Sequence, residues 1–136
     1  MSKSSKEFLS PKTLMAPAGY SHAAKVHSGT IVYLAGQVSS DASGKLIGEG
    51  NFEAQVEQVF RNLKTAVEAA GGAMADVVKV TIYVTNIKNN TKVWAARREF
   101  FTGDFPASTL VEVSALAAPE ILVEIEAIAH IGKGQR

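Results

Sequence analysis

The chain has 136 residues, 46% of them hydrophobic and 20% charged, with a formal net charge of +1 at pH 7 and no cysteine. This length and composition predict a single domain over residues 1–136, exclude disordered and fibrous classes, disulfides and thiolate metal sites, and disfavour nucleic acid as a partner. Because no apolar run is long enough to span a membrane and the first residues lack the apolar core of a signal peptide, we expect no membrane partner and a cytoplasmic location.

The first part of the chain predicts a lead-in segment followed by a hairpin. Residues 1–17 mix Ser, Lys and Pro without clear periodicity, which predicts an irregular or extended lead-in. Residues 21–38 predict two strands joined by a tight turn at Ser28-Gly29, because glycine accepts the positive φ that hairpin turns require.

A helix is predicted from Asn51 to about Ala70. Asn51 can cap its first turn, and Gly71-Gly72 can end it as a C-cap. Apolar side chains recur at three- and four-residue steps and mark one buried stripe. They are Phe52, Val56, Val59, Phe60, Leu63 and Val67.

A strand and a second helix follow. Residues 76–84 alternate as a strand, with Val78 expected on the same face as Val80, Ile82 and Val84. Residues 89–101 return to helical spacing with a weaker apolar stripe. This stripe contains Val93, Ala96 or Arg97, and Phe100. Although its spacing also fits this stripe, we expect Arg97, like Arg98, to face solvent or an interface.

Two strands, residues 107–116 and 121–131, complete the predicted α+β fold. Its order is β-β-α-β-α-β-β, with two helices packed on one face of a mixed sheet. Since two helices cover only one side of such a sheet, the other side is either half-solvated or packed against another subunit around a polar cavity. Of these two arrangements we favour the homo-oligomer.

The sheet face without helices is where we expect polar chemistry. Glu124 and Glu126 stand two residues apart on the last strand, which brings their carboxylates to one side. Ser108 and Glu112, on the preceding strand, are expected to project from the same face. A solvated strand face explains such a carboxylate pair about as often as catalysis does, whereas a partly desolvated carboxylate could serve as a proton shuttle.

Common metal, phosphate and nucleophile motifs do not occur in the sequence. Neither a GxxxxGK[ST] nor a GxGxxG spacing is present, and no GxSxG nucleophile elbow is found. His22, His27 and His130 form no HxH or HExxH pair, so we expect no metal site.

Several separated motifs occur in a characteristic order between about Ala18 and Ile131. They are GYSHA, AGQ, the helix end VEAAGG followed by MADVVKVTIYVT, FFTGDFPA, LVEV and VEIEAIAHI. Together with the element order, they resemble the RidA/YjgF family, the reactive-intermediate deaminases, which are also known as the L-PSP endoribonuclease family. The resemblance implies a chorismate-mutase-like fold assembled as a homotrimer, with the sheets lining a central barrel and small-molecule sites in the clefts between subunits.

The resemblance also implies an activity and the residues that carry it. Active members hydrolyse imines and enamines, such as 2-aminoacrylate, to a keto acid and ammonia without metal or cofactor. By position, Glu124 matches the glutamate that positions water, Tyr20 matches the site tyrosine, and Gly36 matches the glycine of an SGQ motif.

Three substrate-binding positions depart from the family pattern. Ala35 replaces the serine of SGQ, Trp94 stands where asparagine is common, and Ser108 replaces the arginine of FPARS that grips the substrate carboxylate. Losing that charge-assisted pair weakens binding of an α-imino acid by roughly ten- to hundred-fold or more. The pocket therefore serves a substrate without a carboxylate, borrows Arg97 or Arg98, or binds a ligand without turnover. Trp94 makes the site more apolar if it lines the cleft, although we favour a core position for it.

These observations leave three hypotheses for function. The leading one is a RidA-like trimer that hydrolyses a small imine or enamine, with Glu124 as the water-positioning base and Tyr20 and Ser108 as polar contacts. The missing arginine motivates the second, a non-catalytic ligand-binding or chaperone-like trimer. Endoribonuclease activity is the least favoured, because the net charge is near zero and no histidine pair is present.

Overall fold

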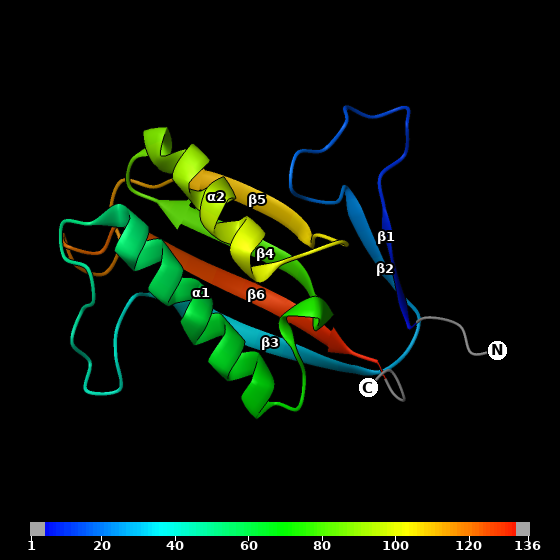
Figure 1. Cartoon of the computed structure of the whole chain (residues 1–136), viewed down its shortest axis with the longest axis horizontal. Helices are drawn as coiled ribbons and strands as arrows, with labels where there is room; N and C mark the ends of the chain where they lie inside the picture. The colour runs from blue at the N-terminus through cyan, green and yellow to red at the C-terminus, as the bar shows by residue number, and fades with distance from the viewer. Residues whose placement is uncertain (1–4, 133–136) are drawn as a thin grey trace.

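The computed structural model describes residues 5–132 and confirms the α+β class (Figure 1). Short 3-10 turns precede β4 and α2, at Met74–Asp76 and Ile87–Asn89. The strands and α-helices, in chain order, are β1 (Lys6–Leu9), β2 (Ala23–Val26), β3 (Thr30–Gln37), α1 (Phe52–Ala69), β4 (Val77–Val84), α2 (Asn90–Phe100), β5 (Ala107–Glu112) and β6 (Val123–Ile131). From β2 onward this is the predicted order.

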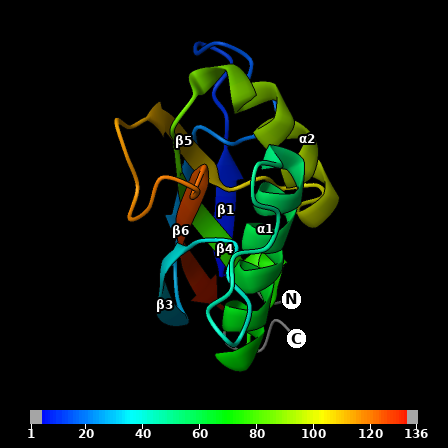
Figure 2. The ribbon, with the colours of Figure 1, turned by 90° about the vertical axis from the view of Figure 1, so that its left-hand side faces the viewer.

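The main sheet has four strands in the order β3-β6-β4-β5. β6 pairs antiparallel with both β3 and β4, whereas β4 and β5 are parallel and are connected through α2. Figure 2 shows α1 and α2 together on one side of this sheet. The mixed sheet with both helices on one face is therefore confirmed, and its opposite side, which we call the open face, is left without helices.

The expected hairpin between β2 and β3 is wrong. Gly29 adopts a positive φ of +114°, as a turn there requires, but β2 pairs with β1 in a separate two-stranded sheet and β3 pairs with β6. Figure 1 shows the β1–β2 pair projecting from the end of the main sheet. The lead-in, which was expected to be irregular or extended, thus contributes a paired strand, and Lys6 joins it to the main body through an ion pair with Asp76 at 3.2 Å.

Helix α1 follows its sequence signals closely. The Asn51 side chain accepts a hydrogen bond from the Ala54 amide at 3.1 Å. At the other end, Gly71 has φ +90° and the Gly72 amide donates to the Val67 carbonyl at 2.9 Å, which is the Schellman arrangement. All six predicted stripe residues are buried: Phe52, Val56, Val59, Phe60, Leu63 and Val67. They pack the helix against the sheet.

A register shift in β4 alters one predicted face. The shift between Val77 and Lys79 brings Val77 into the core, together with Val80, Ile82 and Val84. Val78, which was expected on the same face as Val80, is instead buried beside the open face near Ile128 and His130. From Val80 onward the predicted alternation holds, so the open face carries the polar residues of β4 as expected.

Candidate functional site

A pocket of about 370 Å³ lies between α2, the start of β5 and the segment before β2. We call it the helix pocket. It gathers three of the sequence-predicted substrate-binding residues, Tyr20, Trp94 and Ser108, although they are far apart in the chain. The full lining consists of Met15, Ala16, Ala18, Tyr20, Trp94, Arg97, Ser108 and Leu110.

The segment that carries Tyr20 is held against the beginning of β5. The Ser21 amide donates to the Pro106 carbonyl at 3.1 Å, and its hydroxyl donates to the Phe105 carbonyl at 2.6 Å. The Tyr20 ring meets the His22 ring edge to face, at 5.3 Å between centroids. These contacts hold the tyrosine at the pocket, because the residue that follows it is hydrogen-bonded to the segment before β5.

Arg97 is the charged group of the helix pocket. Its side chain is almost fully buried, with 2% exposed, so the expectation that it faces solvent or an interface is wrong, whereas Arg98 is exposed. Its Nη1 donates to Ser108 Oγ at 2.9 Å, and its Nη2 donates to the Ala18 carbonyl at 3.5 Å. Burial, and then the nearby Arg98 charge, lower the pKa of Arg97, but a guanidinium remains protonated in proteins.

Ser108 and Leu110 face the helices, which corrects the predicted orientation of β5. In the parallel pairing Ser108 lies opposite Val80, a core residue, whereas Thr109 lies opposite Thr81 on the open face. Because directly paired residues project from the same side of a sheet, Ser108 points toward α2. Ser108 and Glu124 therefore do not share a face.

Trp94 lines the helix pocket with 38% of its surface exposed. The core position favoured from the sequence is therefore wrong. An indole at the mouth of the pocket offers an apolar wall and a single N–H donor.

Glu124 lies on the open face beside a bulge in β3. A Cβ at Gly36 would overlap a carboxylate oxygen of Glu124, so the glycine provides the space that this carboxylate occupies. The register of β3 against β6 shifts between Leu34 and Gln37, and Ala35 is exposed next to the bulge. Glu124, Gly36 and Ala35 thus form a second group, which we call the Glu124 group.

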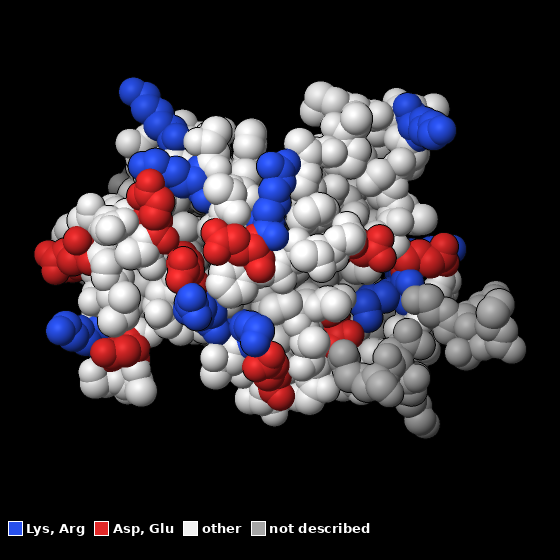
Figure 3. Space-filling view, viewed as in Figure 1, with Lys and Arg blue, Asp and Glu red and all other residues white. Residues whose placement is uncertain are grey.

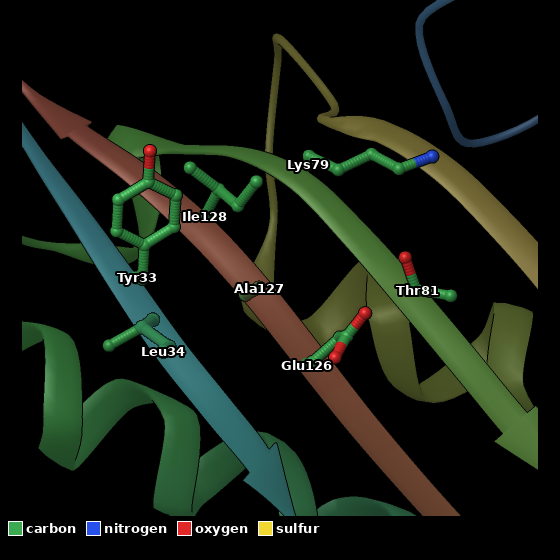
Figure 4. Close-up of a pocket in the computed structure, with 7 residues that line it drawn as sticks. All are labelled: Tyr33, Leu34, Lys79, Thr81, Glu126, Ala127 and Ile128. Atoms are coloured by element: carbon green, nitrogen blue, oxygen red, sulfur yellow. The ribbon is translucent and has the colours of Figure 1, made fainter.

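The neighbouring part of the open face is mixed in chemistry (Figure 4). A hollow of about 200 Å³ there is bordered by Tyr33, Lys79, Thr81 and Glu126. Glu126 accepts a hydrogen bond from the Tyr83 hydroxyl at 3.2 Å. Desolvation, and then hydrogen bonding to Glu126, raise the pKa of Tyr83, so its phenol remains protonated near neutral pH.

The helix pocket and the Glu124 group lie on opposite faces of the sheet. Within one chain, the carboxylate therefore does not point into the pocket that holds Tyr20, Trp94 and Ser108. The structure divides the sequence-predicted site residues into two groups of three, and a single site containing both requires a second copy of the chain.

Comparison with known proteins identifies the family. The family model described as Endoribonuclease L-PSP matches residues 11–131. The chain therefore belongs to the RidA/YjgF family. A RutC family protein from Pyrococcus horikoshii is 37% identical over 126 residues, which cover 92% of this chain and 98% of that protein.

Solved structures of RidA/YjgF proteins share the fold. The Rid family protein of unknown function YyfB from Yersinia pestis has a TM-score of 0.88 and 37% identity, and the match covers 94% of this chain and 100% of that one. RidA from an Antarctic Psychrobacter species has a TM-score of 0.70 and 35% identity, covering 92% and 99%.

Within the part of the chain that the structure describes, no cluster of three or more His, Asp or Glu residues could hold a metal ion. No helix there is long and apolar enough to cross a membrane. On the helix-bearing face, acidic and basic side chains are interspersed and form no continuous basic surface (Figure 3).

Arg97 is the residue of the helix pocket that sequence reasoning placed incorrectly. The predicted stripe of α2 allowed either Ala96 or Arg97 at its middle position, and the structure buries both. The available signal was the spacing of Arg97, which lies four positions after the buried Val93 and three before Phe100. This spacing places Arg97 on the buried face of the helix.

Proposed function

We propose that the chain works as a homotrimer that hydrolyses a small imine or enamine to a carbonyl compound and ammonia, without metal or cofactor. In this proposal, the helix pocket of one subunit and the Glu124 group of a neighbouring subunit face each other across a cleft. The single observation that carries it is the Glu124 carboxylate, which occupies the space left by Gly36 on the open face. Family membership supports a RidA-like protein and leaves the substrate open.

The open face supports assembly because it exposes large apolar side chains. Tyr33 is 75% exposed and Ile31 is 52% exposed, both on β3, and Val111 on β5 is 39% exposed. Clusters of exposed apolar side chains commonly mark protein interfaces. Packing this face against other copies would bury them and bring Glu124 to the subunit boundary.

The proposed chemistry needs one base and one bound water. Glu124 accepts a proton from water while the oxygen attacks the imine carbon, and Glu124 then passes this proton to the nitrogen to give a neutral carbinolamine. The O–H proton of the carbinolamine is next transferred to the nitrogen through the same carboxylate, the C=O bond forms as the C–N bond breaks, and ammonia leaves. An enamine first takes a proton on carbon to become the imine. A positioned general base contributes about 10²- to 10⁴-fold to such a reaction.

The residues of the helix pocket would orient the substrate. Tyr20 and Ser108 supply hydroxyl groups, and Trp94 and Leu110 supply apolar surface. Ala35, beside Gly36, offers only a methyl group where the family motif has a serine. The pocket therefore selects by shape and by the charge of Arg97 more than by polar side chains near the base.

Ammonia release tests the proposal. The purified protein would be mixed with freshly generated 2-aminoacrylate and, separately, with a neutral imine. We expect Glu124→Gln to lower turnover by about 10²-fold or more, because the amide cannot accept the proton. Glu126→Gln is the matched control, since it alters an exposed carboxylate two residues away on the same strand face, and we expect turnover within about threefold of wild type. Activity that survives Glu124→Gln would exclude this residue as the base.

A non-catalytic ligand-binding protein is the second candidate, and Ser108 in place of the family arginine favours it. That function predicts thermal stabilisation by small ligands without any ammonia release from either substrate. Wild-type turnover that is lost in Glu124→Gln would exclude it.

A further inference from the structure

One wall of the helix pocket is a loop. Residues 10–22 connect β1 to β2, and we call them the pocket loop; Figure 1 shows it in blue, beyond the ends of these two strands. It contributes four of the residues that line the pocket, whereas α2 and β5 contribute the others. The four are Met15, Ala16, Ala18 and Tyr20. The helix and the strand belong to the packed main body, so the width of the pocket depends on where this loop lies.

The two ends of the pocket loop are anchored. Leu9 and Ala23 lie opposite each other where β1 and β2 pair, and Ser21 is hydrogen-bonded to the segment before β5. Compact surface loops whose ends lie close together are frequently functional. Because both ends are fixed, any movement of this loop would be a movement of its middle.

The middle of the pocket loop makes few contacts that would fix its position. Leu14 is 51% exposed and Met15 is 77% exposed, although both side chains are apolar. The Leu14 amide donates to the Pro11 carbonyl at 3.1 Å, which closes a local turn without joining it to the main body. Arg97 reaches the Ala18 carbonyl at the long distance of 3.5 Å. Segments with so few packed contacts open locally at low cost in free energy.

The side chain of His22 ties the middle of the pocket loop to its anchored end. Its Nε2 donates to the Met15 carbonyl at 2.6 Å, and its backbone amide donates to Ser10 Oγ at 3.3 Å. Since a carbonyl oxygen only accepts, the bonded ring nitrogen carries the hydrogen. The same ring meets the Tyr20 ring edge to face. One imidazole therefore contacts two residues that line the helix pocket, Met15 and Tyr20.

We propose that His22 is a positioning residue, which holds the pocket loop closed over the helix pocket and thereby sets how tightly a small substrate is bound. A hydrogen bond between neutral groups shifts an equilibrium between open and closed loops by roughly two- to tenfold, which still permits opening for substrate entry. The effect on substrate rests on the proposed function, whereas the position of the loop does not. The two claims can therefore be measured separately.

Trp94 reports the position of the loop directly, because it is the only tryptophan of the chain and lines the same pocket. The measurement is acrylamide quenching of its fluorescence in the full chain. We expect His22→Ala to raise the quenching constant by about 1.5-fold or more, because a loop that opens more often uncovers the indole. His22→Gln should restore the wild-type value, since its amide N–H can also donate to the Met15 carbonyl. Lys25→Ala, at an exposed position of β2 outside the pocket, is the control and should leave quenching unchanged.

The kinetics of ammonia release give the second measurement. We expect His22→Ala to raise KM for the imine by roughly two- to tenfold and to leave kcat within about twofold, because the lost contact serves binding before and during the reaction alike. His22→Gln should restore KM. A merely structural role of His22 would lower the fraction of active protein, which reduces kcat and leaves KM unchanged.

The two measurements separate this inference from the proposed function. Unchanged Trp94 quenching in His22→Ala would overturn the inference, as would a His22→Gln variant that behaves like His22→Ala or a fall in kcat at constant KM. If no sample releases ammonia while quenching still depends on His22, the deaminase proposal fails and the role of His22 in holding the loop stands. If ammonia is released while neither quenching nor KM responds to His22→Ala, the deaminase proposal stands and the role of His22 fails.

Discussion

At the scale of single residues, two glycines make room for the two charged groups of the proposed site. Gly36 gives space to the Glu124 carboxylate, and Gly19 gives space to the Arg97 guanidinium. Gly19 has a positive φ, whereas Gly36 does not. A substitution at residue 36 therefore tests space alone, without backbone strain.

We predict that Gly36→Ala displaces the Glu124 carboxylate and leaves the fold intact. The new methyl group would overlap the far end of a flexible side chain, which can rotate away at little cost. Displacement of a catalytic group by about 1 Å can cost roughly 10²-fold, so we expect a loss of this order in kcat/KM for ammonia release. In the Glu124→Gln background the same change should add little, because both substitutions act on one group. Independent, multiplying losses would contradict this account.

The residues on strands were easier to place from sequence than the one on a short helix. Glu124 could be assigned to the open face because alternation in β6 is regular over nine residues, from Val123 to Ile131. Arg97 could not be assigned, because adjacent positions 96 and 97 both fit the apolar spacing of α2. Its burial depends on Gly19 and Ser108, which only the folded chain brings close.

At the scale of elements, local signals fixed α1, whereas the strands depended on distant partners. The cap and the apolar stripe of α1 lie within the helix and its flanks, so both could be predicted. The orientation of β5 could not, because it follows from its pairing with β4, in which Ser108 lies opposite Val80. The pairing of β2 depends on β1, which has only four residues and no strong strand pattern.

The two helices offer a matched test of capping. Asn51 caps α1 through a hydrogen bond to the Ala54 amide, whereas Asn89, which precedes α2, makes no such bond. We predict that Asn51→Ala lowers the free energy of unfolding by about 1 kcal/mol, because one amide at the helix start loses its acceptor. Asn89→Ala should change it by less than about 0.5 kcal/mol. Urea unfolding at one fixed protein concentration measures both, and equal effects would show that the Asn51 bond contributes little.

At the scale of the whole molecule, the two faces of the sheet have different roles. One face packs on α1 and α2 and forms the core, and the other carries Glu124 together with exposed apolar residues. Sequence alternation predicted this asymmetry but not which groups of the site lie on each side. The separation of Glu124 from the helix pocket makes activity depend on assembly in the proposed trimer.

We predict that Tyr33→Lys breaks the assembly and abolishes turnover together. Tyr33 is 75% exposed on β3, so a lysine there is tolerated in the isolated fold, but burying its charge between subunits is unfavourable. Sedimentation equilibrium should give the mass of a trimer for wild type and of a monomer for Tyr33→Lys, with ammonia release reduced to background. Ala69→Lys adds the same charge at an exposed position of α1 and should keep both the trimer and the activity. If Tyr33→Lys remains a trimer, the interface lies elsewhere on the molecule. If Tyr33→Lys is an active monomer, Glu124 and the helix pocket act without facing each other across a cleft, which contradicts the proposed function.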